Sequence, residues 1–150
     1  MSEELRELYQ EQILDHSKRP RNKREIGGAR SAEGYNPLCG DRATVYVALD
    51  GDVVKDVSFV GQGCSISTAS ASMMTEAIKG KSIEEVLGAF DRFQGMITTP
   101  IDTAVDLEGF GKLEALAGVR EFPMRVKCAT LAWHTLKAAL TKSASVARTE

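Results

Sequence analysis

The chain has 150 residues, of which 43% are hydrophobic and 27% are charged, a composition typical of a soluble globular protein. We therefore expect one domain over residues 1–150. The net charge of −2 gives no general reason to expect binding to nucleic acid, and no apolar run approaches the roughly 18 residues of a membrane span. The amino terminus, MSEELRELYQEQ, is charged and helix-forming rather than a secretory signal, so we expect a cytoplasmic protein without membrane contact.

The first third of the chain predicts one helix followed by a long connector. Apolar residues at helical spacing, among them Leu8 and Ile13, predict a helix that runs to about His16. A cation is favoured at a helix C-terminus, so His16 is expected to cap that end. Residues 17–41 are rich in Arg, Lys, Asn, Gly and Pro and predict an extended surface connector. The basic run HSKRPRNKR (residues 16–24) is either a solvated part of this connector or a docking surface for a partner.

Residues 45–59 predict a β-hairpin. Hydrophobic side chains alternate over residues 45–49 and again over residues 53–59, which is the period of a strand with one buried face. Asp50-Gly51 between them is a strong signal for a two-residue turn. Lys55 interrupts the second alternation and indicates a sheet edge or a bulge.

Helices are expected in most of the remaining sequence. Ser65 and Gly80 suit the N-cap and the end of one helix, and Ser82 with Glu85 forms a capping box ahead of the next. Residues 94–122 give a weaker signal, with one short helix around residues 112–117. Pro123 suits the first turn of a final helix.

The order of these elements, helix, hairpin and then helices, predicts an α+β fold. We expect a small antiparallel sheet of about three strands with the helices packed on one face. The last residues, about 142–150, are expected to form a frayed tail.

Each of the three cysteines lies at a junction between expected elements. Cys39 is in the turn NPLCGD, two residues before Asp41, whereas Cys64 and Cys128 lie near the starts of helices. The partial positive charge of a helix N-terminus stabilises a thiolate, so we expect lowered pKa values for Cys64 and Cys128. The intervals between the cysteines match no short zinc-finger spacing, and each cysteine taken singly could equally be a small core residue.

Three motifs together resemble a known family. NPLCGD, GQGCSISTASASMM and RVKCATLAW resemble the U-type iron–sulfur assembly proteins, the family of the NifU amino-terminal domain and IscU, and the similarity spans residues 5–140. The resemblance implies an α+β domain in which Cys39, Asp41, Cys64 and Cys128 converge at one exposed end. Three thiolates and one carboxylate suit the ligand preferences of Zn²⁺.

Two features separate this chain from the scaffold proteins of the family. Scaffolds of the IscU kind have a histidine directly before the third cysteine, where this chain has Lys127, and their segment between Cys64 and Cys128 is shorter. Both features resemble the SufU branch, whose members are zinc-dependent sulfurtransferases.

The branch resemblance implies a function and two catalytic residues. The protein is expected to accept persulfide sulfur from a pyridoxal-phosphate-dependent cysteine desulfurase of the SufS type and to pass it to downstream SUF scaffold proteins. Cys39 is the implied sulfur acceptor, released from zinc when the partner docks. Arg125 flanks Cys128 in sequence and is common to the branch motif, so it is expected either to steady the anionic sulfur or to be a solvated residue at the helix start. The alternative is an assembly scaffold of the IscU type that carries an iron–sulfur cluster instead of zinc.

Overall fold

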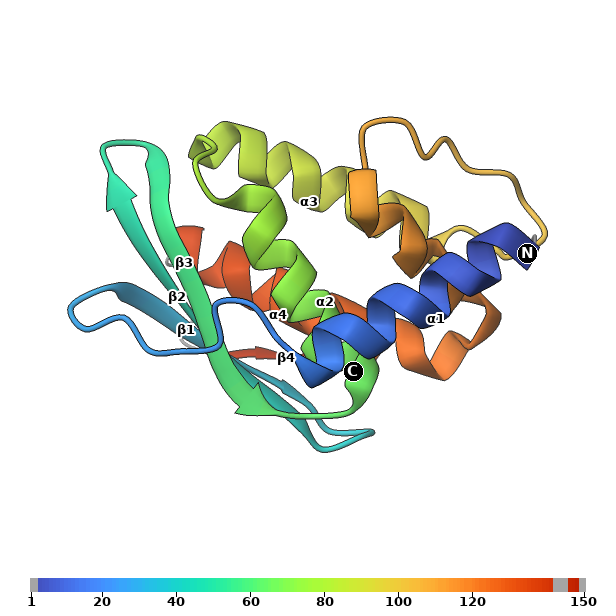
Figure 1. Cartoon of the computed structure of the whole chain (residues 1–150). Coiled ribbons are helices and arrows are strands. Elements are labelled where there is room, and N and C mark those ends of the chain that lie inside the picture. The colour runs from blue at the N-terminus through green and yellow to red at the C-terminus, as the bar shows by residue number, and fades with distance from the viewer. Residues whose placement is uncertain (1–2, 142–145, 149–150) are drawn as a thin grey trace.

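The computed structural model describes residues 3–141 and 146–148. Its elements are, in chain order, α1 (Glu3–Lys18), β1 (Arg30–Asn36), β2 (Asp41–Asp50), β3 (Val53–Gln62), α2 (Ser65–Ile78), α3 (Ile83–Thr98), the 3₁₀ helix η1 (Gly111–Glu121), α4 (Pro123–Thr141) and β4 (Val146–Arg148). The strands form one sheet in the order β3-β2-β1-β4, and all the helices lie on one side of it (Figure 1). The predicted α+β fold with helices on one face is confirmed.

The sheet consists of three antiparallel strands and one short parallel strand. β2 pairs antiparallel with both β1 and β3, and β4 pairs parallel with Glu33–Tyr35 of β1. β4 lies within the segment predicted to be frayed, so residues 146–148 differ from that prediction, whereas residues 142–145 and 149–150 lie outside the described residues. The three-stranded antiparallel part agrees with the sequence.

The hairpin between β2 and β3 differs from its prediction by one residue. Asp50 pairs with Val53, so the two-residue turn is Gly51-Asp52 rather than Asp50-Gly51, and Gly51 takes the positive φ of 62° that the turn requires. The pairing skips Lys55, because Ala48 pairs with Asp56 and Leu49 with Val54. Lys55 therefore marks a bulge, as its interruption of the alternation predicts.

Strand β1 lies in the segment that was predicted to be a surface connector, and that prediction is wrong. Ala32 and Asn36 are 3% and 0% exposed, so one face of β1 is buried. A Cβ on Gly34 would overlap the hydroxyl of Thr135 and lie 3.0 Å from Leu131 Cδ1, both on α4. Glycine at this position therefore lets α4 lie directly against the strand.

The core lies between the sheet and helices α2, α3 and α4. Its largest fully buried side chain is Trp133 of α4, whose ring stacks on Phe93 of α3 with centroids 4.4 Å apart. Such stacked aromatic pairs add to the free energy that their burial supplies. This packing positions α4, and with it Cys128.

His16 belongs to the core rather than to the end of α1. Its side chain is fully buried, and its Nδ1 lies 2.7 Å from Ser72 Oγ of α2. Burial, followed by the nearby Arg21, lowers the pKa of His16. The predicted capping role, which requires the charged form, is therefore wrong, because burial disfavours that form.

Arg120 is a buried cation in the segment between α3 and α4. Its Nε donates to the carbonyl of Ala117 at 3.0 Å, and its Nη1 donates to the carbonyls of Pro100 and Thr103 at 3.1 and 3.0 Å. These carbonyl oxygens replace the water that a buried guanidinium would lose. Arg120 thereby joins η1 to the loop that follows α3.

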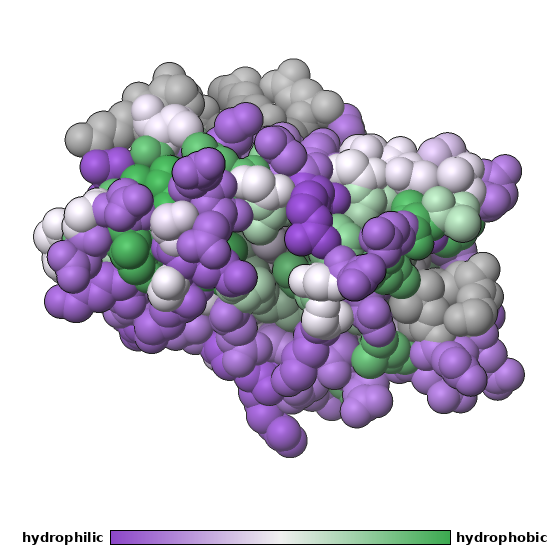
Figure 2. Space-filling model, turned by 90° about the horizontal axis from the view of Figure 1, so that it is seen from above, coloured by the Kyte–Doolittle hydropathy of each residue, from purple (hydrophilic) through white to green (hydrophobic). Residues whose placement is uncertain are grey.

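The outer surface carries no broad apolar face in the view from above. That face is largely hydrophilic, and its hydrophobic residues appear in small separate patches (Figure 2). Within residues 3–141 and 146–148, no helix combines the length and the apolar character needed to cross a bilayer.

Candidate metal centre

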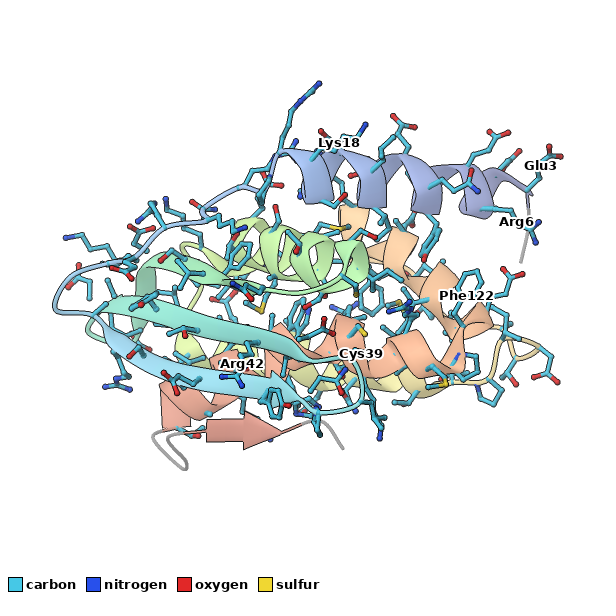
Figure 3. All side chains as sticks on the ribbon, turned by 90° about the horizontal axis from the view of Figure 1, so that it is seen from below. Glu3, Arg6, Lys18, Cys39, Arg42 and Phe122 are labelled. Carbon is cyan, nitrogen blue, oxygen red and sulfur yellow. The ribbon has the colours of Figure 1, made fainter. Side chains whose placement is uncertain are left out.

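The turn between β1 and β2 presents Cys39 and Asp41 at one end of the sheet. The backbone N–H of Gly40 donates to the carbonyl of Asn36 at 2.8 Å, and Gly40 has a φ of 72°, which favours glycine. Cys39 is exposed on this turn, whereas Asp41, the first residue of β2, is only 2% exposed. Figure 3 shows Cys39 beyond the ends of β1 and β2, beside the pale orange helix α4.

Helix α4 brings Cys128 to the same place. Cys128 is fully buried, and its sulfur lies 3.5 Å from the sulfur of Cys39. The side-chain ligand atoms of Cys39, Asp41 and Cys128 all lie within 4.8 Å of one another. Two sulfurs on one tetrahedral zinc ion, each bound at about 2.3 Å, lie about 3.8 Å apart, so this spacing suits zinc.

Asn36 is a part of this site that the sequence alone did not single out. It is fully buried, and its side-chain nitrogen donates to Asp41 Oδ2 at 3.5 Å and to the sulfur of Cys128 at 3.7 Å. Its side-chain oxygen accepts from the backbone N–H of Leu38. The only signal in the sequence was its place at the head of the NPLCGD turn.

Cys64 is close to the cluster but lies outside the group of three. It is the N-cap of α2, so the predicted cap Ser65 is wrong by one residue. The Cys64 sulfur accepts from the backbone N–H of Ser67 at 3.4 Å, and its own N–H donates to Asp41 Oδ1 at 3.0 Å. The backbone N–H of Cys64 thus holds the carboxylate of Asp41, while the Cys64 sulfur accepts a hydrogen bond from a free N–H group in the first turn of α2.

The pKa of Cys128 is shifted in the direction opposite to the prediction. Burial raises the pKa of the Cys128 thiol, and hydrogen bonding with Asp41 and Cys39 raises it further. The predicted lowering is therefore wrong, because Cys128 lies in the second turn of α4 and has lost its contact with water. A bound cation would act in the opposite direction, since a thiol that coordinates a metal is deprotonated. The donor set therefore fits a soft divalent cation.

Arg125 lies next to the cysteines. It is exposed on the first turn of α4, and a hydrogen bond with Cys128 raises the pKa of its guanidinium, as does the proximity of Cys64. Lys127, which stands where scaffold proteins have a histidine, is half-buried. His134 packs edge-on against Phe90, with ring centroids 5.2 Å apart, and is not part of the group of possible metal ligands.

The structure is an α+β domain that gathers two thiols and a carboxylate at one end of its sheet, an arrangement that could hold a metal ion and that defines the class of protein to compare. The sequence agrees with one family of this class: the model of the NifU-like N-terminal domain matches residues 8–146. The chain belongs to that family.

The relatives include both functional branches. The zinc-dependent sulfurtransferase SufU of Bacillus subtilis (strain 168) is 48% identical over 136 residues, which cover 90% of each chain. The iron–sulfur cluster assembly scaffold protein IscU of Streptococcus pyogenes serotype M1 is 45% identical over 141 residues, which cover 94% of this chain and 87% of that protein.

Solved structures agree with this assignment. A provisionally assigned iron–sulfur cluster assembly scaffold protein for the SUF system, from Fervidobacterium islandicum AW-1, superposes with a TM-score of 0.80 at 38% identity, covering 89% of this chain and 97% of its own. The N-terminal part of a nitrogen-fixing NifU-like protein from Brucella abortus has a TM-score of 0.78 at 20% identity, which shows the shared fold alone.

Proposed function

We propose that this protein is a zinc-dependent sulfurtransferase of iron–sulfur cluster assembly, with Cys39 as the sulfur acceptor. Its partner would be a pyridoxal-phosphate-dependent cysteine desulfurase of the SufS type, and the sulfur would pass on to downstream SUF scaffold proteins. The similarity to the SufU of Bacillus subtilis supports this function. Lys127, in the position of the scaffolds' histidine, supports it as well.

The contrast between Cys39 and Cys128 is the observation that carries the proposal. Their sulfurs are 3.5 Å apart, yet Cys39 is exposed on a turn and Cys128 is fully buried in a helix. A sulfur acceptor must be reached by a partner's persulfide, whereas a permanent metal ligand gains from burial. We assign zinc to Cys39, Asp41, Cys64 and Cys128. Cys64 would be the fourth ligand, and its sulfur accepts from the backbone N–H of Ser67 in this structure.

The transfer is a thiol–disulfide type of exchange. The Cys39 thiolate attacks the terminal sulfur of the desulfurase persulfide, a new S–S bond forms on Cys39, and the partner's cysteine leaves as a thiolate. Zinc, when bound, keeps the thiols deprotonated at neutral pH. Arg125, whose guanidinium pKa is raised by Cys128, Cys64 and Cys39, would steady the negative charge on the acceptor sulfur. Asp41, Cys64 and Cys128 would keep the metal during the transfer, and the burial of Asp41 and Cys128 favours this role.

The second candidate is an assembly scaffold of the IscU type. It is favoured by the 45% identity to the Streptococcus pyogenes scaffold protein, which is close to the identity with SufU. Thiolate and carboxylate ligands also suit an iron–sulfur cluster. A scaffold would be purified as a brown protein with visible absorption, and a zinc transferase as a colourless protein with one tightly held zinc per chain.

Mass spectrometry after incubation with desulfurase and cysteine tests the acceptor. We expect one additional sulfur on the wild type and on Lys55→Ala, which alters an exposed strand residue, and none on Cys39→Ala. Turnover of the desulfurase should rise with the wild type and not with Cys39→Ala. If Cys39→Ala gains a persulfide at the rate of the wild type, Cys39 is not the acceptor.

A further inference from the structure

A concave surface lies away from the cysteine cluster, between α2, α3 and the start of η1. This α2–α3 pocket has a volume of about 410 Å³ and is lined by residues that include Met73, Ala77, Ala89 and Leu113. Cys64 caps the other end of α2, and Ala77 lies roughly 20 Å from it along the helix axis at 1.5 Å per residue. The pocket is therefore separate from the candidate metal centre.

The pocket exists because small residues line the two helices that bound it. Ala77 of α2 and Ala89 of α3 are both only partly buried, so neither alanine fills the space between the helices. Gly111 at the start of η1 has a φ of 57°, and a Cβ there would meet nothing within 4 Å. Met73 and Leu113, which are 3% and 7% exposed, supply an apolar floor.

The charged residues of the pocket are mainly cations. Lys81, Arg92 and Lys112 line it together with a single carboxylate, that of Glu76, although the whole chain has a net charge of −2. Glu76 Oε1 lies 3.6 Å from the buried Nε2 of His16, so this carboxylate already faces a polar group of the core. The excess of positive charge therefore favours an anion in the pocket.

The cations differ in what they already contact. Arg92 donates to the carbonyl of Glu108 at 2.7 Å and lies over the ring of Phe110 at 4.8 Å, so it holds the loop that forms one wall. Within the described residues, by contrast, neither Lys81 nor Lys112 forms an ion pair, and both are exposed at the rim. Their ammonium groups are therefore available to a ligand.

We propose that the α2–α3 pocket binds a small organic anion with an apolar body and a carboxylate or phosphate group. The body packs against Met73, Ala77 and Leu113, and the anionic group lies between Lys81 and Lys112. The volume is in the range of small-molecule sites, which combine an apolar lining with a few polar groups. Charge-assisted hydrogen bonds from two lysines would orient the ligand.

Titration of the zinc-loaded, ¹⁵N-labelled protein with three probes of one shape tests this proposal. The probes are 2-naphthoate, 2-naphthyl phosphate and the uncharged 2-naphthylmethanol. We expect saturable shifts of the amides of Ala77, Lys81 and Ala89 with the two anions, and binding at least about tenfold weaker with the alcohol. The anion that binds with the higher affinity shows whether the pocket prefers a carboxylate or a phosphate group.

Three variants locate the binding. Lys112→Glu and Ala89→Leu, which reverse a rim charge and fill the space, should each weaken binding of the anions by about tenfold or more. Lys55→Glu makes the same charge change on an exposed residue of β3 and should leave binding unchanged. Thermal unfolding of each variant shows whether it is folded, and if Ala89→Leu unfolds, Ala77→Leu replaces it.

Several results would overturn the proposal. Absence of saturable shifts with either anion, equal binding of the alcohol, or equal loss in Lys55→Glu would each contradict it. Shifts confined to the amides around Cys39 would place the anion at the metal centre instead. If the signals of the pocket amides shift only when a protein partner is added, and not with either anion, the pocket is a docking surface for that protein instead. The persulfide assay on Cys39 is unaffected by each of these outcomes.

Discussion

The side-chain nitrogen of Asn36 lies 3.7 Å from the sulfur of Cys128, although the two residues are 92 positions apart in the chain. The same nitrogen lies 3.5 Å from the carboxylate of Asp41. One buried amide therefore holds two of the assigned metal ligands, from a strand and from a helix, in a fixed relation.

Replacement of Asn36 by alanine should weaken metal binding. Partners that orient metal ligands contribute about 10- to 100-fold to metal affinity, so we expect a loss of this size in Asn36→Ala. Competition with a chromogenic chelator measures the zinc affinity. Asn22→Gly serves as the control, because Asn22 also donates from its side chain, to Thr75, and its φ of 59° suits glycine. Equal affinities of Asn36→Ala and the wild type would show that Asn36 does not orient the ligands.

The three thiols should react in the order of their exposure. In the presence of a chelator, we expect N-ethylmaleimide to label the exposed Cys39 first, the half-buried Cys64 next and the buried Cys128 last. Burial also raises the pKa of Cys128, which lowers the fraction of its reactive thiolate. Peptide mass spectrometry of timed samples gives the order, and all three should react together in urea. Early labelling of Cys128 would contradict its burial.

Removal of the Arg120 side chain should destabilise the fold. Arg120→Ala leaves the carbonyls of Pro100 and Thr103 without their buried donor, and hydrogen bonds to charged groups contribute about 1.5–3 kcal/mol. We expect the free energy of unfolding to fall by about 2–3 kcal/mol in urea titrations. Arg19, with 85% of its side chain exposed, is the matched control, and Arg19→Ala should change stability by less than about 0.5 kcal/mol. Similar values for both variants would disprove the role of Arg120.

The free energy of unfolding should decrease as the pH is lowered towards and below about 6.5. Burial lowers the pKa of His16, and burial followed by the charge of Lys137 lowers that of His134. Both histidines therefore stay neutral in the folded chain at pH values where the unfolded chain, with a histidine pKa near 6.5, takes up protons. Because the unfolded state binds more protons, the free energy of unfolding decreases as pH falls from about 7.5 through 6.5 and below.

Urea unfolding at a series of pH values, with chelator present to exclude metal release, measures this dependence. His16→Gln should flatten the slope below pH 6.5, and His134→Gln should flatten it independently. Since Glu76 and Asp15 partly oppose the effect of burial on His16, Glu76→Gln should steepen the slope. A wild-type slope of the opposite sign would show that the folded state binds more protons than the unfolded state, which would contradict neutral histidines in the folded chain.

The elements that the sequence predicted well are those with a strong apolar period or a local cap. The hairpin, the capping box of Ser82 and Glu85, and the start of α4 at Pro123 depend on neighbouring residues alone. Strand β1 was missed because its buried face is made of Ala32, Gly34 and Asn36, which are small or polar and give no hydrophobic alternation. Their burial follows from the approach of α4, and a local pattern does not contain that information.

The candidate site, like the fold, has some features that the sequence predicted and others that only the structure shows. The cysteines and Asp41 were found from their motifs, but their convergence came from the family resemblance, because residues separated by whole elements meet only through tertiary packing. The pKa of Cys128 was predicted in the wrong direction since its depth in the core was unknown. Asn36 was overlooked because a buried amide in a turn motif looks the same in sequence as a solvated one.

Gly34 has no side chain that could bind a metal, yet it affects the geometry of the candidate metal centre. It allows Leu131 and Thr135 of α4 to rest on β1, and Leu131 lies one helical turn after Cys128. β1 also leads directly into the turn that carries Cys39 and Asp41. The absence of one methyl group therefore sets the separation between the two halves of the site, and a larger residue there would move the sulfur of Cys128 away from that of Cys39 as the whole helix is displaced.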